Sequence, residues 1–81
     1  MARVLLFGRL SDVAGWRERT LDAGAGSIAA IRALLAAEDA DLGEALVAPG
    51  VQVAVDQAIV RGDLVLSAAS EVAFLPPMSG G

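Results

Sequence analysis

The sequence predicts an α+β fold, in which one main helix packs on one face of a mixed sheet of four to five strands. Three observations lead to this prediction. Short apolar runs occupy residues 3–7 and 71–75, near the two ends of the chain. The alanine-rich residues 27–38 have the apolar spacing of an amphipathic helix. The chain is 81 residues long, which suits one small domain.

The first and last apolar runs are expected to be neighbouring strands in the centre of the sheet. Residues 3–7 and 71–75 are almost entirely apolar, which indicates strands that are covered on both faces. Residues 16–22 alternate imperfectly between large and charged side chains. We expect them at the sheet edge, because their Arg and Glu residues would protect an exposed strand.

A hairpin is predicted between residues 51 and 60. Residues 51–55 and 58–60 are apolar, and only Asp56 and Gln57 separate them. Two polar residues between apolar runs are typical of a tight turn that joins antiparallel strands. With the helix on one face of all these strands, the predicted arrangement is a β-grasp.

The main helix is expected over residues 27–38. Ser27 suits the N-cap, because its hydroxyl can accept from the first free backbone N–H groups. Alanines fill most of the other positions and favour helix. The large apolar side chains share one helical stripe: Ile28, Ile31, Leu34 and Leu35.

The remaining segments are expected to be connections. Residues 8–15 contain Ser, Asp and two glycines, which predicts a loop with at most one helical turn. Residues 23–26 are expected to form a turn, and residues 64–70 a connection of small side chains. Residues 38–44 are acidic and predict a solvated connection, with a short helical turn over residues 42–47.

The composition excludes several kinds of chemistry within this chain. It has no Cys, His, Lys or Tyr, so thiolate catalysis, cysteine-held zinc, a Schiff base and a Ser–His pair are excluded. We expect the chain to bind no cofactor and no metal of its own. A net charge of −4 argues against nucleic-acid binding. The longest strongly apolar run has four residues, which argues against membrane insertion and a signal peptide and favours a cytoplasmic protein.

Strand alternation predicts an apolar surface on the side away from the helix. The residues assigned to the helix side are Val4, Leu6, Val72 and Phe74. The residues assigned to the outward side are Leu5, Phe7, Ala73 and Leu75, which Ile59 could join. Either loop residues such as Trp16 or Leu64 cover the outward side, or it is a hydrophobic docking patch for another protein.

The chain ends in an unusual tail, Pro-Pro-Met-Ser-Gly-Gly. Pro76 and Pro77 cannot donate to a sheet ladder and hold the backbone extended. Gly80 and Gly81 have no Cβ, so they can pass through a narrow channel and present the terminal carboxylate. Six residues reach roughly 20 Å when extended. We therefore divide the chain into a β-grasp domain, residues 1–75, and an extended, flexible tail, residues 76–81; the alternative is a frayed terminus.

The whole chain resembles the small subunit of molybdopterin synthase, a ubiquitin-like sulfur carrier. The resemblance rests on the start R-V-L-L-F-G, the helix from Ser27, the hairpin V-A-V-D-Q-A-I-V and the end E-V-A-F-L-P-P-M-S-G-G. It implies that an ATP-using activating enzyme, related to ubiquitin-activating enzymes, adenylates the carboxylate of Gly81. Sulfur from a donor protein then converts Gly81 into a thiocarboxylate.

The resemblance also implies partners and the residues that meet them. The carrier would dock on the large synthase subunit in a heterotetramer and insert Gly80 and Gly81 into its active site. The thiocarboxylate would give sulfur to a cyclic pyranopterin precursor, which becomes a dithiolene. The carrier would thus be a sulfur-donating subunit without catalytic side chains of its own. Its partner-binding residues would be Phe7, Ile59, Leu75, Pro76, Pro77, Met78 and Ser79.

Other functions remain open at this point. The chain could carry sulfur for thiamine or thiolated tRNA, or it could be a ubiquitin-like modifier that is conjugated to other proteins. From a different class, it could be an adaptor β-grasp domain with an inert tail.

Overall fold

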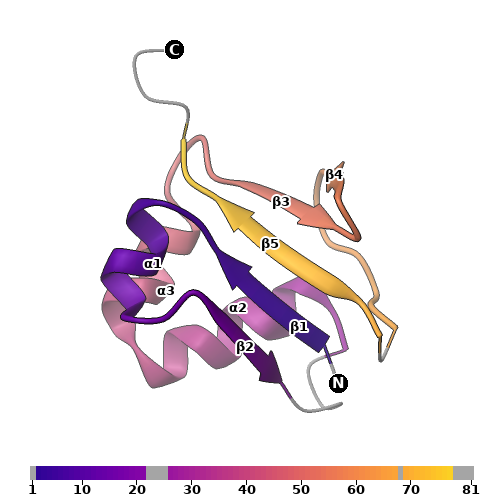
Figure 1. The fold of residues 1–81 in the computed structure, drawn as a ribbon, viewed down its shortest axis with the longest axis horizontal. Coiled ribbons are helices and arrows are strands. Elements are labelled where there is room, and N and C mark those ends of the chain that lie inside the picture. The colour runs from indigo at the N-terminus through magenta and orange to yellow at the C-terminus, as the bar shows by residue number, and fades with distance from the viewer. Residues whose placement is uncertain (1, 22–25, 68, 78–81) are drawn as a thin grey trace.

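A five-stranded mixed sheet forms the centre of the computed structural model, which describes residues 2–21, 26–67 and 69–77 (Figure 1). The strand order is β2-β1-β5-β3-β4. The central pair, β1 and β5, is parallel, and the other neighbouring pairs are antiparallel. The strands are β1 (Ala2–Leu6), β2 (Glu18–Leu21), β3 (Gln52–Val55), β4 (Ala58–Val60) and β5 (Glu71–Leu75).

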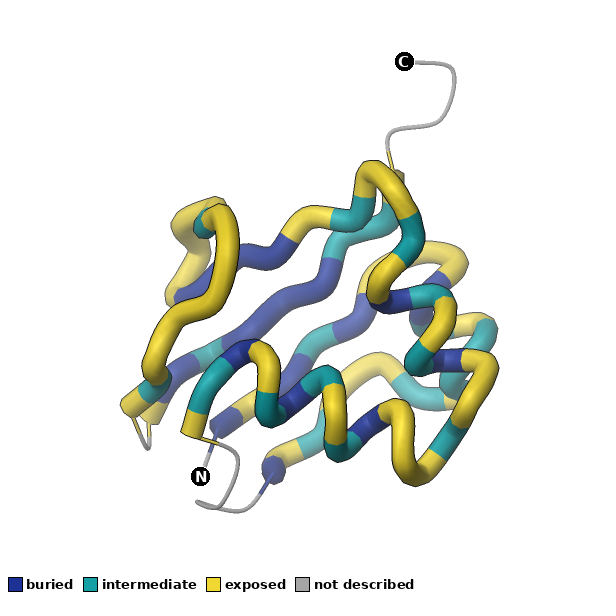
Figure 2. Tube along the Cα trace, turned by 180° about the vertical axis from the view of Figure 1, so that it is seen from behind, coloured by how far each residue is buried: buried dark blue, intermediate teal, exposed yellow. Residues whose placement is uncertain are grey.

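Three helices cover one face of this sheet: α1 (Arg9–Ala14), α2 (Ile28–Glu38) and α3 (Ala40–Leu46). Figure 2 views the molecule from the helix side and shows buried positions along the central strands and at intervals along the helices. The fold is a ubiquitin-like β-grasp, as predicted. The central placement of the first and last strands is also confirmed.

The predicted division of residues between the two faces is confirmed on the helix side. Val4, Leu6, Val72 and Phe74 are at most 2% exposed and belong to one core cluster with the helices. The helices contribute their own buried side chains to that cluster: Leu10, Ile28, Ile31, Leu35, Leu42 and Leu46.

The start of α2 agrees with the sequence prediction. The Ser27 hydroxyl oxygen accepts from the backbone N–H of Ala30 at 3.0 Å, so Ser27 is the N-cap. Along the predicted stripe, Ile28, Ile31 and Leu35 are fully buried and Leu34 is partly buried against the core.

The β3–β4 hairpin is confirmed as well. Asp56 and Gln57 both have positive φ, 50° and 72°, as a two-residue turn between right-twisted strands requires. The turn also holds the start of β5. The Asp56 carboxylate accepts from the Glu71 N–H at 2.9 Å, and the Asp56 N–H donates to the Glu71 carbonyl at 2.8 Å.

The solvated connection predicted for residues 38–44 was wrong, because most of it is the helix α3. One Asp39 carboxylate oxygen accepts from the backbone N–H groups of Asp41 and Leu42, at 3.1 and 3.2 Å. One of the acidic residues of this segment, Asp39, therefore caps a helix. Gly43 lies in the middle of α3 because a Cβ there would be 2.5 Å from the Ala36 Cβ of α2.

Smaller differences occur at other segments. Residues 8–15 contain the six-residue helix α1, which ends at Gly15 with a left-handed backbone (φ 82°) and an N–H that donates to the Ser11 carbonyl. The edge strand predicted for residues 16–22 is β2, which is shorter and does lie at the sheet edge. The turn predicted at residues 23–26 falls mostly outside the described residues.

An ion pair ties the edge strand to the main helix. The Arg19 guanidinium contacts both carboxylate oxygens of Glu38, at 2.6 and 3.3 Å, and lies over the Trp16 ring at 5.1 Å from its centroid. This hydrogen-bonded guanidinium lowers the pKa of the Glu38 carboxyl from its usual value. Neither α1, α2 nor α3 is long and apolar enough to cross a membrane.

The Asp39 cap predicts a measurable stability effect. Asp39→Ala removes the acceptor for two backbone N–H groups and should lower the free energy of unfolding by about 1 kcal/mol. Asp39→Asn keeps a capping oxygen and should lose less than half as much. Urea denaturation followed by circular dichroism measures both variants, and equal losses would contradict the capping role.

Candidate functional site

The outward face of the sheet carries a contiguous apolar surface. Strand pairing places four residues in one row across four strands, Leu5–Ala73–Ala54–Ile59. Phe7 and Leu75 follow toward the C-terminal ends of β1 and β5. Together we call these six residues the outward patch: Leu5, Phe7, Ala54, Ile59, Ala73 and Leu75.

Large side chains at two sides of the outward patch are open to solvent. Phe7 is 45% exposed and Ile59 is 50% exposed. Leu5 and Leu75 are partly buried. Ala73 was expected to face outward as open surface, but it is only 9% exposed, because its small side chain lies in mid-sheet between Leu5 and Ala54.

The loop residues that could have covered this face lie elsewhere. Trp16 packs against the core cluster on the helix side and beneath Arg19. Leu64 lies beside the start of α2, where its carbonyl accepts from the Ile28 N–H. The alternative in which Trp16 or Leu64 covers the outward patch is therefore wrong.

The outward face is charged at one end and apolar at the other. Arg3 pairs with Glu18 at 3.0 Å and with Glu71 at 3.3 Å, across three neighbouring strands. Arg3 and Glu71 are register partners, and the next outward row runs from Glu18 at the sheet edge to Leu5 and then along the outward patch. The apolar end of the face is consequently the end at which β5 leaves the sheet (Figure 1).

Two glycines hold the segment that follows β5, which we call the tail root (Pro76 and Pro77). A Cβ on Gly8 would lie 3.1 Å from the Pro76 Cγ, and a Cβ on Gly50 would lie 2.9 Å from the Pro77 Cβ. Both glycines also have positive φ, 55° and 88°. Each proline therefore lies directly against backbone, which fixes where the chain leaves the domain.

Sequence reasoning identified Pro76 and Pro77 but missed their glycine partners, as it missed Ala54. In the sequence, Gly8 only follows the apolar run of residues 3–7, and Gly50 only precedes the predicted hairpin. The other predicted tail residues, Met78, Ser79, Gly80 and Gly81, lie outside the described residues.

A groove of about 560 Å³ adjoins the tail root. Its walls come from α1 and α3, and Pro76 and Pro77 form part of its lining. Leu10 and Val13 make the groove partly apolar, while Asp41 and Glu44 add negative charge. Within residues 2–21, 26–67 and 69–77, no cluster of three acidic side chains has a metal-binding arrangement.

The β-grasp sheet, with helices on one face and an apolar outward face that leads to a glycine-ended chain, defines the class of ubiquitin-like proteins. The chain belongs to the ThiS family, whose model matches residues 4–81. The match therefore includes the tail as well as the domain. ThiS-family proteins are ubiquitin-like sulfur carriers, which work with activating enzymes and sulfur-using partners.

Solved structures of small archaeal modifier protein 1 have the same fold. The crystal structure of the protein from Haloferax volcanii is 23% identical, with a TM-score of 0.83 over 99% of this chain and 98% of that chain. The solution structure from Methanosarcina acetivorans is 20% identical, with a TM-score of 0.85 over 99% and 95% of the two chains. No curated protein matches this chain by sequence.

The contact between Gly50 and Pro77 predicts a specific effect on the tail. Gly50→Ala and the control Gly62→Ala both place a side chain at positive φ, which should cost about 1 kcal/mol of folding free energy. Only Gly50→Ala also displaces the tail root, because no atom lies within 4 Å of the Cβ position at Gly62.

Nuclear magnetic resonance distinguishes the two variants. Amide shifts of Leu75 and Val51 should change in Gly50→Ala and stay unchanged in Gly62→Ala. Unchanged shifts in both variants would show that Gly50 does not position the tail root.

Proposed function

We propose that this chain is the sulfur carrier subunit of molybdopterin synthase. The observation that carries the proposal is the continuity of the outward patch with the tail root. Leu75 belongs to the patch, and Pro76 and Pro77 follow it against Gly8 and Gly50. A partner that covers Phe7, Ile59 and Leu75 would therefore receive the tail at a defined position.

The proposed reaction begins at the terminal carboxylate. A carboxylate is a poor electrophile, so the activating enzyme transfers AMP from ATP to Gly81 and releases pyrophosphate. Sulfur that a donor protein supplies at the oxidation level of sulfide attacks the acyl carbon, the C–O bond to AMP breaks, and AMP leaves a Gly81 thiocarboxylate behind. ATP is thus used by the activating enzyme, and this chain binds no cofactor itself. We place these steps in the cytoplasm.

The large synthase subunit would supply the side chains for the second stage. Gly80 and Gly81 enter its active site without Cβ atoms, and Met78 and Ser79 line the entrance. The thiocarboxylate gives its sulfur to the cyclic pyranopterin precursor, and two such transfers complete the dithiolene. Two carriers and two large subunits would form the heterotetramer.

A second candidate is a protein modifier, which the fold of the small archaeal modifier proteins supports. In that case the adenylated Gly81 would be attacked by an amine of another protein. The chain has no Lys, so it offers no side-chain amine for attachment to itself. In both candidates Gly81 is first adenylated. They differ in what happens next, which is sulfur transfer to the pyranopterin or attachment to an amine of another protein.

The activation step is tested by intact mass spectrometry. Incubation with the activating enzyme, ATP and a sulfur donor should add about 16 Da, as sulfur replaces one oxygen. The variant without Gly81 should gain no mass and should keep its circular dichroism spectrum. The large subunit and the pyranopterin precursor should then return the loaded carrier to its original mass.

The other outcomes identify the alternatives. Loading without transfer to the pyranopterin would assign the carrier to thiamine or tRNA thiolation. Attachment to lysines of other proteins would identify a modifier. An unchanged mass with the activating enzyme would favour an inert adaptor.

The outward patch predicts a loss of partner binding. Phe7→Ala should weaken binding to the large subunit at least tenfold, because it truncates an exposed aromatic side chain of the proposed contact. Val65→Ala is the matched control, since Val65 is 83% exposed and lies beside Ser27, away from the patch. Titration calorimetry measures both affinities, and equal values would remove Phe7 from the interface.

A further inference from the structure

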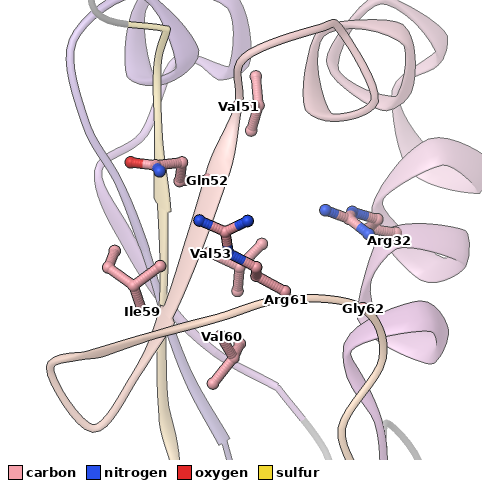
Figure 3. A pocket seen from close by; sticks show the side chains of 8 residues that line it. All are labelled: Arg32, Val51, Gln52, Val53, Ile59, Val60, Arg61 and Gly62. Atoms are coloured by element: carbon pink, nitrogen blue, oxygen red, sulfur yellow. The ribbon is translucent and has the colours of Figure 1, made fainter.

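A second groove lies at the other edge of the sheet, between α2 and the β3–β4 hairpin (Figure 3). Its volume is about 310 Å³. Val53 and Val60 form an apolar part of its lining, and the charged side chains of the lining are those of Arg32 and Arg61. This groove differs from the first one, which lies between α1, α3 and the tail root, although Val51 lines both.

Arg32 is held in place by the core. Its guanidinium carbon lies 5.7 Å from the centroid of the Phe74 ring, and Phe74 is fully buried. The ring occupies one face of the guanidinium and leaves the N–H groups at its edge free to bind elsewhere. The Arg32 Nε is buried and has no hydrogen-bond partner among the described residues. A buried donor of this kind is stabilised by an acceptor.

Arg61 enters the same groove from the segment after β4. Figure 3 shows its side chain on the hairpin side of the groove, with the guanidinium near β3, and Arg32 on the opposite side, on α2. Gly62 follows with φ 77°, which turns the chain directly after Arg61. Two cations from different walls therefore line one groove.

The groove has no carboxylate in its lining to balance these cations. The ion pairs among the described residues use Arg3 and Arg19. The chain as a whole is acidic, with ten carboxylate side chains and a net charge of −4. Two positive charges in one groove repel each other. A bound anion would offset this repulsion, because it attracts both guanidinium groups.

We propose that this groove binds a phosphate group. A guanidinium fork matches the oxygens of phosphate, and two forks from different directions suit a tetrahedral dianion. A carboxylate is planar, and one guanidinium group is enough to bind it, so phosphate suits the two arginines better. Space beside Val53 and Val60 admits a small group attached to the phosphate, so the ligand is free phosphate or a phosphate monoester.

The full chain labelled with ¹⁵N tests this site. Titration with inorganic phosphate at constant ionic strength should shift the Arg32 and Arg61 signals saturably, and neighbouring β3 and β4 amides with them. Arg32→Gln and Arg61→Gln should each weaken binding at least tenfold. Arg17→Gln removes the same charge from an exposed position outside the groove and should bind as the unchanged protein does.

The controls make the result decisive. Equal phosphate affinity in Arg17→Gln, Arg32→Gln and Arg61→Gln would overturn the proposal, as would acetate binding as tightly as phosphate. Arg61 is exposed, so Arg61→Gln remains informative even if Arg32→Gln fails to fold. Adenosine monophosphate and glycerol phosphate distinguish the sources. Tighter binding than phosphate with shifts at Val53 and Val60 supports a monoester, and equal binding supports free phosphate.

Discussion

Parallel pairing of β1 with β5 is the contact on which the other features depend. It places the first and last strands side by side in mid-sheet, so that alternate residues point to opposite faces. Val4, Leu6, Val72 and Phe74 then form the base of the helix-covered core. The same alternation sends Leu5 and Leu75 to the outward patch. Core and outward patch are two sides of one pair of strands.

Local signals were sufficient to predict much of this fold. Ser27 marked the start of α2, and Asp56 with Gln57 marked the hairpin, because each acts on residues close in sequence. Only the second half of α3 was predicted, as a short helical turn over residues 42–47, since the acidic residues 38–44 suggested a solvated loop. In fact, Asp39 caps the helix, and the burial of Leu42 and Leu46 depends on packing against α2 and the core.

The site was predictable where it depended on strand alternation and on the end of the sequence. Phe7, Ile59 and the two prolines followed from those features. Gly8 and Gly50 were not recognised, because their role depends on contacts with Pro76 and Pro77, which are distant in sequence. The Arg32–Arg61 groove also depends on residues that are distant in sequence, since α2 and the end of β4 meet only in the folded chain. Such contacts leave no local pattern.

The pairing of Arg3 with Glu71 joins residues from almost opposite ends of the chain, and it has a consequence for synthesis. A growing polypeptide cannot complete the middle of the sheet until β5 has been made, since contacts between distant segments form only after the intervening chain exists. Pro76 can reach Gly8 only after that last strand is in place. A fragment that lacks β5 therefore cannot form the contact between Pro76 and Gly8.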